Sequence, residues 1–464
     1  MPISMAEPEK RDLVSIDDLG TEEILELFRH ADEFRENLTA WSEIGRGAIM
    51  ATLFFEPSTR TRLSFESAML RLGGGVISAA DEKTTSRSKG ESLADTVRVV
   101  GGSYADILVV RHPQDGAARV AARYARVPVI NGGDGAHEHP TQTLCDLYTL
   151  WKEKGHLEGL EVVLCGDLRY SRTIHSFCYA LARFRANIIT IPYPGFELPD
   201  YVLHRLKRDF GVQAATASVG DLPGIATKEN SAAYLTASKP HQLALFTSLS
   251  NIEVRQIDAI YMTRAQRERH SGEDTANYPR LSSSTMRAEA ARNARVMHPL
   301  PRVDEIDYEL DSDPRSVYFR QAELGVPMRM ALMAFLLGRI QLAAPPPVLR
   351  STMPGLPGGP GMRCHNERCI SNGEGVRYLT RDFRLREKDV PPVLACAYCE
   401  REQEARFIGH LGSHVFHRFD DRAVERIKPQ NRVYFESEAQ ALAAGFQSAR
   451  SAQDAPPPGP DPSV

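Results

Sequence analysis

The sequence predicts an α/β protein with two lobes built on parallel sheets, followed by a small β module of the zinc-ribbon type. Over roughly the first 340 residues, short apolar runs alternate with stretches of helical periodicity, as in α/β folds. The alternation comes as two successive sets, which indicates two lobes. Behind them the composition changes at a segment rich in proline and glycine, and two pairs of closely spaced cysteines follow.

Each predicted lobe contains apolar strands that lead through polar turns into amphipathic helices. Residues 49–55 (IMATLFF) form the first such strand, and the helix after it has apolar residues three and four positions apart. Residues 162–165 form a second buried strand with a helix of the same periodicity behind it, and residues 186–191 form the next strand. Residues 328–342 predict a last, strongly apolar helix.

The predicted domain boundaries follow these changes in pattern. The first lobe spans residues 1–146 and is completed by a helix at 316–342, while the second lobe spans 147–315. A linker covers 343–361, because the runs AAPPP and MPGLPGGPG cannot form a packed element. The remaining predicted segments are a cysteine module (362–408), a C-terminal module of unknown role (409–454) and a disordered tail (455–464).

The composition argues against several classes of protein. Lysine and arginine total 56 and aspartate and glutamate total 60, a formal charge of −4, which argues against a general nucleic-acid binder. The sequence has no run of about 18 or more apolar residues, so we expect no membrane span. Its N-terminus lacks the apolar core of a signal peptide. We therefore expect a cytoplasmic protein whose partners are neither nucleic acids nor membranes.

Four of the seven cysteines form the two close pairs behind the linker. Four residues separate Cys364 from Cys369, and two separate Cys396 from Cys399. This spacing fits a structural, tetrahedral zinc site with four thiolate ligands and no open position. The alternative, two disulfides, is disfavoured in a reducing cytoplasm. A module of fewer than about 50 residues would need the metal to fold.

Residues 58–62 (STRTR) lie between a predicted strand and a predicted helix, and therefore at a helix N-terminus. Free backbone N–H groups and the helix dipole bind phosphate at such a place, and hydroxyls and arginines add side-chain donors. The alternative is an N-cap with exposed arginines, because serine and threonine are common caps. From these residues alone both interpretations stay open.

Two further polar segments carry groups suited to a carbonyl and an amide. The stretch GGDGAHEHPTQTLCD brings His137, His139 and Gln142 to the start of another helix. Histidine can donate to a carbonyl oxygen, and glutamine can accept from an NH₂ group. Residues 297–302 (MHPLPR) contain two prolines that fix the backbone and leave carbonyl groups for a ligand. Taken singly, these segments also fit helix capping or a rigid loop.

Six motifs together resemble the catalytic chains of aspartate carbamoyltransferases. In the order of that family, the sequence contains FFEPSTRTRLSFE, VRHP, HPTQTLCDL, GDLRYSRTIHS, YMTRAQRER and HPLPRVDEI. The resemblance covers roughly residues 12–342. It implies one lobe for carbamoyl phosphate and one for L-aspartate, with the last helix returning to the first lobe. It also implies a homotrimer whose active sites lie between subunits, with higher assembly through the cysteine module as a further possibility.

The resemblance further implies a role for each matching residue. Carbamoyl phosphate would be bound by Ser58, Thr59, Arg60, Thr61, Arg111, His139, Gln142, Pro299 and Leu300. The catalytic residues, which stabilise charge on the carbonyl oxygen and the leaving phosphate, would be Arg60, Thr61, Arg111 and His139. L-Aspartate would be bound by Arg172, Arg264 and Gln266, with Lys89 reaching in from a neighbouring subunit.

The implied reaction gives N-carbamoyl-L-aspartate and phosphate, an early step of pyrimidine biosynthesis, and needs no covalent nucleophile and no catalytic metal. The aspartate amine attacks the carbonyl carbon, and phosphate leaves as the candidate proton acceptor. Arg264, Gln266 and Pro299 favour a dicarboxylate over ornithine, because an arginine would repel the cationic ornithine side chain. The alternatives are a carbamoyltransferase for another amine and a catalytically silent scaffold that docks a partner.

The sequence departs from the family pattern in two places. In the loop before Lys89, either Thr85 or Ser86 is a candidate for the hydroxyl that the family places there, and the sequence does not distinguish them. Residues 220–252 are longer than the usual connection and are expected to form a surface insertion near the aspartate lobe.

The cysteine module resembles the zinc domain of the aspartate carbamoyltransferase regulatory chain, which binds the catalytic chain. The matching letters are CHNERCISN and ACAYCERE. Only a linker precedes Cys364, where that family has a nucleotide-binding effector domain. We therefore expect this chain to be a fusion whose module bridges or steadies trimers without nucleotide control. A saturable effect of CTP or ATP that maps to the module would contradict this.

The C-terminal module faintly resembles metal-binding modules of DNA-repair methyltransferases, which ligate metal through cysteine. The C-terminal module contains no cysteine, and we expect His410, His414 and His417 to be surface residues. Residues 436–449 predict a helix. The side chains expected to face inward on this helix are Ala439, Leu442, Ala443 and Phe446.

Overall fold

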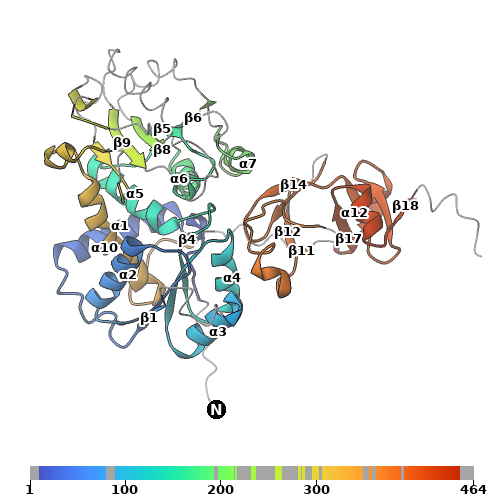
Figure 1. Cartoon of the computed structure of the whole chain (residues 1–464), viewed down its shortest axis with the longest axis horizontal. Coiled ribbons are helices and arrows are strands. Elements are labelled where there is room, and N and C mark those ends of the chain that lie inside the picture. The colour runs from blue at the N-terminus through green and yellow to red at the C-terminus, as the bar shows by residue number, and fades with distance from the viewer. Residues whose placement is uncertain are drawn as a thin grey trace, which may run out of the picture. The chain divides into compact units, whose positions relative to one another are not determined.

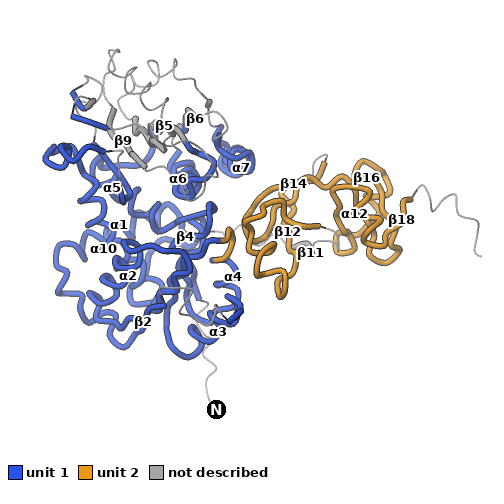
Figure 2. The backbone as a smooth tube through the Cα atoms, viewed as in Figure 1, with its two compact units in different colours: residues 1–113, 118–348 blue, residues 114–117, 349–464 orange. Residues whose placement is uncertain are grey.

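The structure is a computed structural model, and it resolves into two compact units (Figures 1 and 2). One unit comprises residues 1–113 and 118–348, and the other comprises residues 114–117 and 349–464. The residues that the structure describes are 10–79, 89–185, 187–192, 197–213, 215–216, 231–236, 257–263, 281–283, 285–287, 295–302, 306–347, 355–357, 362–387 and 391–449.

The first lobe is built on a four-stranded parallel sheet in the order β2-β1-β3-β4. Its strands are β1 (Ile49–Phe54), β2 (Gly75–Ala79), β3 (Ile107–His112) and β4 (Val129–Asp134). The helices between them are α2 (Thr59–Arg71), α3 (Leu93–Ser103) and α4 (Ala117–Tyr124). In the register of β1 and β3, Phe54 lies opposite Arg111 at the carboxyl end of the sheet. Parallel sheets carry their ligand sites at this end, because the turns into the following helices meet there.

Three long helices close the core of this lobe. They are α1 (Thr21–Glu36), α5 (Pro140–Lys154) and α10 (Tyr318–Leu336). The ring of Phe28 on α1 lies 5.3 Å from Tyr148 and 5.7 Å from Trp151 of α5, measured between centroids. Helix α10 is buried on most of its surface because it packs against α1, α2 and α5. The strongly apolar stretch that begins at Met328 is helical as its sequence predicted, but the helix ends at Leu336 and not at residue 342.

The second lobe has a six-stranded parallel sheet in the order β10-β9-β8-β5-β6-β7. Its strands are β5 (Glu161–Gly166), β6 (Asn187–Pro192), β7 (Ala215–Thr216), β8 (Ser231–Thr236), β9 (Ile257–Thr263) and β10 (Arg295–Met297). Helices α6 (Arg172–Arg183) and α7 (Asp200–Phe210) follow β5 and β6.

Strand β8 corrects one expectation about this lobe. It falls within residues 220–252, which we expected to be a surface insertion, yet β8 lies between β5 and β9 in the middle of the sheet. Its letters SAAYLT lack the branched apolar residues that mark a buried parallel strand. Tertiary pairing therefore determines this strand more than its own propensity. The rest of that stretch lies outside the described residues.

The second unit contains two four-stranded sheets. The cysteine module carries β12 (Asp382–Glu387), β13 (Val393–Cys396) and β14 (Glu402–Glu404), all antiparallel. Strand β11 (Gly355–Pro357) lies within the predicted linker and pairs antiparallel with β12, which corrects the expectation that residues 343–361 form no packed element. The C-terminal module carries β15 (Phe407–His410), β16 (Val415–Arg418), β17 (Arg432–Phe435) and β18 (Gln447–Ser448), in the order β17-β15-β16-β18. Two short helices, α11 (Ala423–Arg426) and α12 (Glu438–Ala443), complete the C-terminal module.

The predicted helix at 436–449 was wrong in length and in orientation. Helix α12 ends at Ala443, and Gly445 then takes a φ of 80°, which turns the chain into β18. Leu442 is 53 % exposed, whereas Ala441 and Phe446 are buried. Phe446 reaches the core only because the chain leaves the helical path before it.

Across the described residues, no helix has the length and apolar character that crossing a membrane requires.

Candidate active site

The turn from β1 into α2 forms one wall of the main pocket of the first unit. Ser58 is the N-cap residue of α2 and has extended backbone geometry, but its side chain makes no capping hydrogen bond. The alternative interpretation, in which the Ser58 hydroxyl caps the helix, therefore does not hold, and the hydroxyl is available to a ligand. The Phe55 N–H donates to the Arg111 carbonyl at 2.8 Å, which fixes the turn against β3.

The pocket has a volume of about 650 Å³. Ten of the residues singled out from the sequence line it: Ser58, Thr59, Arg60, Thr61, Arg111, His139, Gln142, Arg172, Pro299 and Leu300. They come from the N-termini of α2, α5 and α6, from the end of β3 and from the loop after β10. Three helix N-termini thus contribute to one cavity, which favours an anionic ligand.

Two buried arginines in the pocket share one carboxylate, Glu56. Arg111 Nη2 lies 3.2 Å from Glu56 Oε1, and Arg172 Nη1 lies 3.0 Å from Glu56 Oε2. The same arginines donate to main-chain carbonyls, Arg111 to Gly132 at 3.0 Å and Arg172 to Gly135 at 2.9 Å. One carboxylate between two guanidinium groups leaves net positive charge. Sequence reasoning missed Glu56, although its place between an apolar strand and the STRTR turn marked it.

His139 is oriented by the helix that it caps. Its Nδ1 accepts from the Gln142 N–H at 3.3 Å, at the start of α5. Because Nδ1 is an acceptor, the neutral ring carries its proton on Nε2, which makes Nε2 a donor. His139 is buried and lines the pocket, so it suits polarisation of a carbonyl oxygen. His137 instead lies beside Asp134, with Nδ1 and Oδ2 3.1 Å apart, and does not line the pocket.

The loop after β10 closes the other side of the pocket. The Leu300–Pro301 bond is cis, and Leu300 has a φ of 51°. The Leu300 N–H donates to His298 Nδ1 at 2.7 Å, and the His298 N–H donates to Gln321 Oε1 at 2.9 Å. The loop is therefore held from within and from α10. Pro299 has no N–H, so its only backbone hydrogen-bonding group is its carbonyl oxygen, which is an acceptor.

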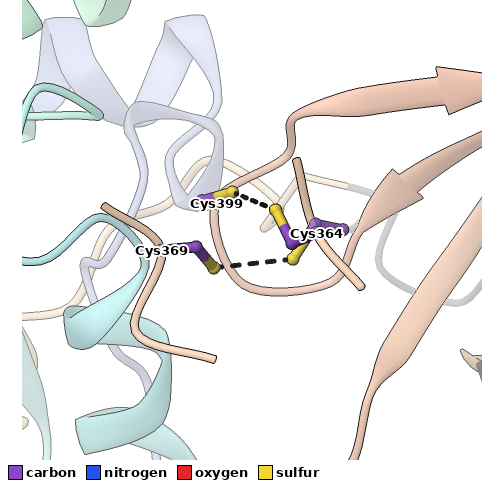
Figure 3. Close-up of side chains that lie close together, drawn as sticks. Cys364, Cys369 and Cys399 are labelled. Atoms are coloured by element: carbon purple, nitrogen blue, oxygen red, sulfur yellow. Dashed lines mark hydrogen bonds between the residues drawn. The ribbon is translucent and has the colours of Figure 1, made fainter. Parts of the chain in front are cut away.

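A second constellation, in the other unit, is formed by four buried cysteines. The sulfurs of Cys364, Cys369, Cys396 and Cys399 all lie within 4.8 Å of one another. Cys364 and Cys399 approach to 3.4 Å, and Cys369 and Cys396 approach to 3.8 Å (Figure 3). These distances are far longer than a disulfide bond, so the alternative of two disulfides does not fit this arrangement.

The electrostatics of this cluster suit a cation. Burial raises the pKa of the Cys399 thiol, while hydrogen bonds from the other three sulfurs lower the pKa of Cys396 well below its usual value. The neighbouring thiols thus favour a thiolate at Cys396, and a dication bound among the four sulfurs would favour the thiolate form of them all. The fit to a four-thiolate metal site is good.

Residues 114–117 belong to the same unit as the cysteine module. The Asp115 N–H donates to the Arg368 carbonyl at 2.9 Å, and the Ile370 N–H donates to the Asp115 carbonyl at 3.0 Å. Asn366 Nδ2 also donates to Asp115 Oδ2 at 2.7 Å. Arg368 and Asn366 lie between the first two cysteines. A segment from the catalytic-chain part of the sequence thus joins the turn that carries metal ligands.

Comparison with known proteins agrees with this geometry. Residues 11–152 match the carbamoyl-phosphate-binding domain, and residues 158–336 the aspartate/ornithine-binding domain, of aspartate/ornithine carbamoyltransferases. Catalytic subunits of aspartate carbamoyltransferase from Clostridium kluyveri and Clostridium botulinum are 42 % and 44 % identical over 334 residues, which is 71 % of this chain and 98 % of each relative. This chain belongs to the aspartate carbamoyltransferase family.

Solved aspartate carbamoyltransferase structures support the same assignment. The catalytic subunit from M. jannaschii aligns with a TM-score of 0.57 at 39 % identity, over 71 % of this chain and 98 % of that one. The Trypanosoma cruzi enzyme, solved with N-(phosphonacetyl)-L-aspartic acid, aligns with a TM-score of 0.57 at 34 % identity, over 70 % and 95 %. The predicted fold class is therefore confirmed. Residues 360–408 match the metal-binding domain of the aspartate carbamoyltransferase regulatory chain.

Not every residue that the carbamoyltransferase motifs singled out is placed by the structure. Arg264 and Gln266 lie outside the described residues, and so do Thr85 and Ser86. Lys89 is described and exposed, and it does not line the pocket of its own chain. The predicted contribution of Lys89 from a neighbouring subunit therefore stays a prediction.

Proposed function

We propose that the chain transfers the carbamoyl group of carbamoyl phosphate to the amine of L-aspartate, which gives N-carbamoyl-L-aspartate and phosphate. The observation that carries the proposal is the convergence of ten motif residues on one pocket. Related structures from Trypanosoma cruzi have been solved with carbamoyl phosphate and aspartate, and with carbamoyl aspartate and phosphate. The reaction is an early step of pyrimidine biosynthesis.

The phosphate would sit at the N-terminus of α2, on Ser58, Thr59, Arg60 and Thr61. The Ser58 hydroxyl, which makes no capping hydrogen bond, and the backbone N–H groups at the helix N-terminus provide neutral donors. Arg60 adds a charge that offsets the charge of the departing phosphate. Binding by donors that are already in place costs little reorganisation when the phosphate leaves.

The carbamoyl group would be held between α5 and the loop after β10. The His139 Nε2–H, Arg111 and Thr61 would donate to the carbonyl oxygen, where negative charge develops as the amine attacks. The Gln142 side-chain carbonyl and the carbonyls of Pro299 and Leu300 would accept from the NH₂ group. The aspartate amine forms the new C–N bond, the C–O bond to phosphate breaks, and phosphate takes the amine proton.

The second substrate would bind where Arg172 meets the pocket. Arg172 already holds one carboxylate, that of Glu56, in two contacts of 3.0 and 3.2 Å. A guanidinium fork of this kind also suits an aspartate carboxylate. Arg264 and Gln266 would bind the other carboxylate, as the YMTRAQRER motif implies.

We infer a homotrimer with shared active sites from the resemblance to the family, and exposed apolar side chains on the first lobe support a contact between subunits. On α2, Leu63 is 52 % and Leu70 is 61 % exposed, and they lie two helical turns apart on one face. Ile77, on the edge strand β2, is 40 % exposed. Leu63 also lines the pocket, so a second chain covering this face would reach the site. Sedimentation equilibrium should give the mass of three chains or a multiple of it.

We infer that the four cysteines bind zinc and that catalysis needs no cofactor. Four thiolates in a closed arrangement select zinc among common cytoplasmic metals. The contact of this metal turn with Asp115 supports a module that steadies the catalytic assembly. Residues 360–408 match the metal-binding domain of the regulatory chain, and we infer that this module acts without nucleotide control. We also infer a cytoplasmic location, where four such thiols stay reduced.

The decisive experiment is product formation by the purified chain from carbamoyl phosphate, with L-aspartate and L-ornithine supplied separately. Turnover with L-aspartate alone is expected. Turnover with L-ornithine alone would mean that the second lobe selects another amine. No turnover with either, in a zinc-loaded trimer, would favour the silent scaffold and overturn the proposal.

A further inference from the structure

A buried carboxylate lies directly behind the carbamoyl side of the pocket. Asp146, on α5, has no exposed surface. It accepts from Gln142 Nε2 at 2.8 Å and from Gln321 Nε2 at 2.9 Å. Since a carboxylate offers acceptors only, both glutamines turn their NH₂ groups towards Asp146 and their carbonyl oxygens away from it. Asp146 thus determines that the carbonyl oxygen of each amide, and not its NH₂ group, points away from the carboxylate.

The hydrogen bonds continue from Asp146 to the loop after β10. Gln321, on α10, uses its side-chain carbonyl oxygen to accept from the His298 N–H at 2.9 Å. His298 Nδ1 in turn accepts from the Leu300 N–H at 2.7 Å. Gln321 and His298 are 2 % and 1 % exposed, so these bonds form in a dry environment where each is strengthened. One carboxylate therefore connects Gln142 on one side of the pocket with Leu300 on the other.

We propose that Asp146 is a positioning residue that makes this pocket select an NH₂ group on its acyl phosphate substrate. The proposal rests on the proposed function. With its NH₂ group held by Asp146, Gln142 presents a carbonyl oxygen to the pocket that it lines. The Pro299 and Leu300 carbonyls present acceptors from the other side. Only an N–H donor satisfies such a set, and the methyl group of acetyl phosphate leaves buried acceptors unpaired.

A purely structural role for Asp146 makes a different prediction. Asp146 ties α5 to α10, so its loss will lower stability under either interpretation. Only a positioning role requires the NH₂ preference to change when the fold is kept. The measured quantity is therefore the KM for carbamoyl phosphate relative to the inhibition constant of acetyl phosphate, determined on the full-length chain.

The first test is Asp146→Asn, which keeps the shape but adds a donor. The Gln142 amide can then rotate and present its NH₂ group to the pocket. We expect the KM for carbamoyl phosphate to rise at least tenfold, which corresponds to about 1.4 kcal/mol. The inhibition constants of acetyl phosphate and inorganic phosphate and the KM for L-aspartate should change less than threefold. An unchanged ratio of carbamoyl to acetyl phosphate would overturn the proposal.

The second test is Gln321→Met, which interrupts the same series of hydrogen bonds at α10. It tests the proposal even if the Asp146→Asn protein does not fold. It leaves Gln142 on Asp146 but releases the His298 N–H, so a loss of three- to tenfold in the same ratio is expected. A folded Gln321→Met enzyme with unaltered selectivity would also overturn the proposal. Thr149→Val is the matched control. Thr149 is equally buried on α5 and bonds only its own helix at the Cys145 carbonyl, at 2.8 Å, so this variant should keep the selectivity.

Failure of the proposed function appears elsewhere, in the unmodified chain. If that chain forms no N-carbamoyl-L-aspartate, the assigned reaction is wrong. If it does and the variants keep their selectivity, the reaction stands and the role of Asp146 is wrong.

Discussion

The cysteine module and the C-terminal module are neighbours of similar size, but they are held together by different interactions. In the cysteine module, four sulfurs gather beside a few buried apolar side chains, including Ile370, Phe383 and Leu394. The C-terminal module has no cysteine and buries a cluster of aromatic rings around Phe435. Small domains lack the buried area to be stable by packing alone, and a metal supplies what packing does not. Two adjacent four-stranded sheets of similar size therefore differ in what stabilises them, a cluster of four cysteines in one and an aromatic core in the other.

Removing the metal should produce the largest difference between the two modules. Cys399→Ser, or a strong chelator, deprives the cysteine module of binding free energy on the order of 10 kcal/mol, so residues 362–404 should lose their order. Hydrogen exchange should show fast exchange there and unchanged protection over residues 407–448. Metal analysis should fall from one zinc per chain to none. Cys178→Ala, a buried cysteine of α6, is the control and should keep one zinc.

Loss of protection in both modules on zinc removal would contradict this division. It would mean that the C-terminal module depends on the metal as well, and that the two sheets fold as one unit.

Truncating the aromatic core should reverse the pattern. Phe435 is fully buried, and its ring lies 5.0 Å from Phe446 in an edge arrangement. Phe435→Ala should cost about 3 to 5 kcal/mol, enough to unfold a module of this size. Exchange protection over 407–448 should be lost while one zinc stays bound. Leu442→Ala, at a 53 % exposed position, should cost less than about 0.5 kcal/mol.

The difference between the modules also marks what could be predicted from sequence. The clustering of the four cysteines could be predicted from their spacing, because cysteines at those intervals are typical of a zinc site. The aromatic core could be predicted only in part, since helical periodicity correctly placed Phe446 inside but also placed Leu442 inside, which is 53 % exposed. Helix α12 ends at Ala443, before the chain turns at Gly445. Helix propensity and hydrophobic periodicity are local properties of the sequence, and they do not predict the residue at which a short helix ends.

The same limit applies to the active site. The STRTR turn and His139 were predictable because a strand, a turn and a helix N-terminus are adjacent in sequence. Asp146 and Gln321 were not, because 175 positions separate them and only the packing of α10 on α5 brings them together. Motifs thus identify groups that touch the ligand, whereas the groups that orient them depend on the tertiary structure.

A smaller effect is expected where the two modules meet. The Glu436 carboxylate, next to the C-terminal sheet, accepts from Gln403 of the cysteine module and lies 2.8 Å from His365 Nε2. Glu436→Ala removes both of these contacts, together with the hydrogen bond from Gln440 Nε2 at 3.1 Å within the C-terminal module, and should cost about 1 to 3 kcal/mol. Calorimetry should show the C-terminal module melting earlier, with zinc content unchanged. Unchanged melting would mean that these bonds do not couple the modules.

The smallest effect is expected from the loss of a helix cap. Its size, compared with that of Phe435→Ala, distinguishes the contribution of helix α12 from that of the aromatic core. Ser437 is the N-cap of α12, and its Oγ accepts from the Gln440 N–H at 3.2 Å. Ser437→Ala leaves that donor unpaired, which should cost about 1 kcal/mol, whereas Ser437→Asp keeps the acceptor and the stability. Hydrogen exchange should locate the change in α12 and not in β12 or β13. Ser437→Ala would contradict this if it destabilised the whole module as strongly as Phe435→Ala does. The six-residue α12 would then be essential to the aromatic core, and packing alone would not explain how this module folds without a metal.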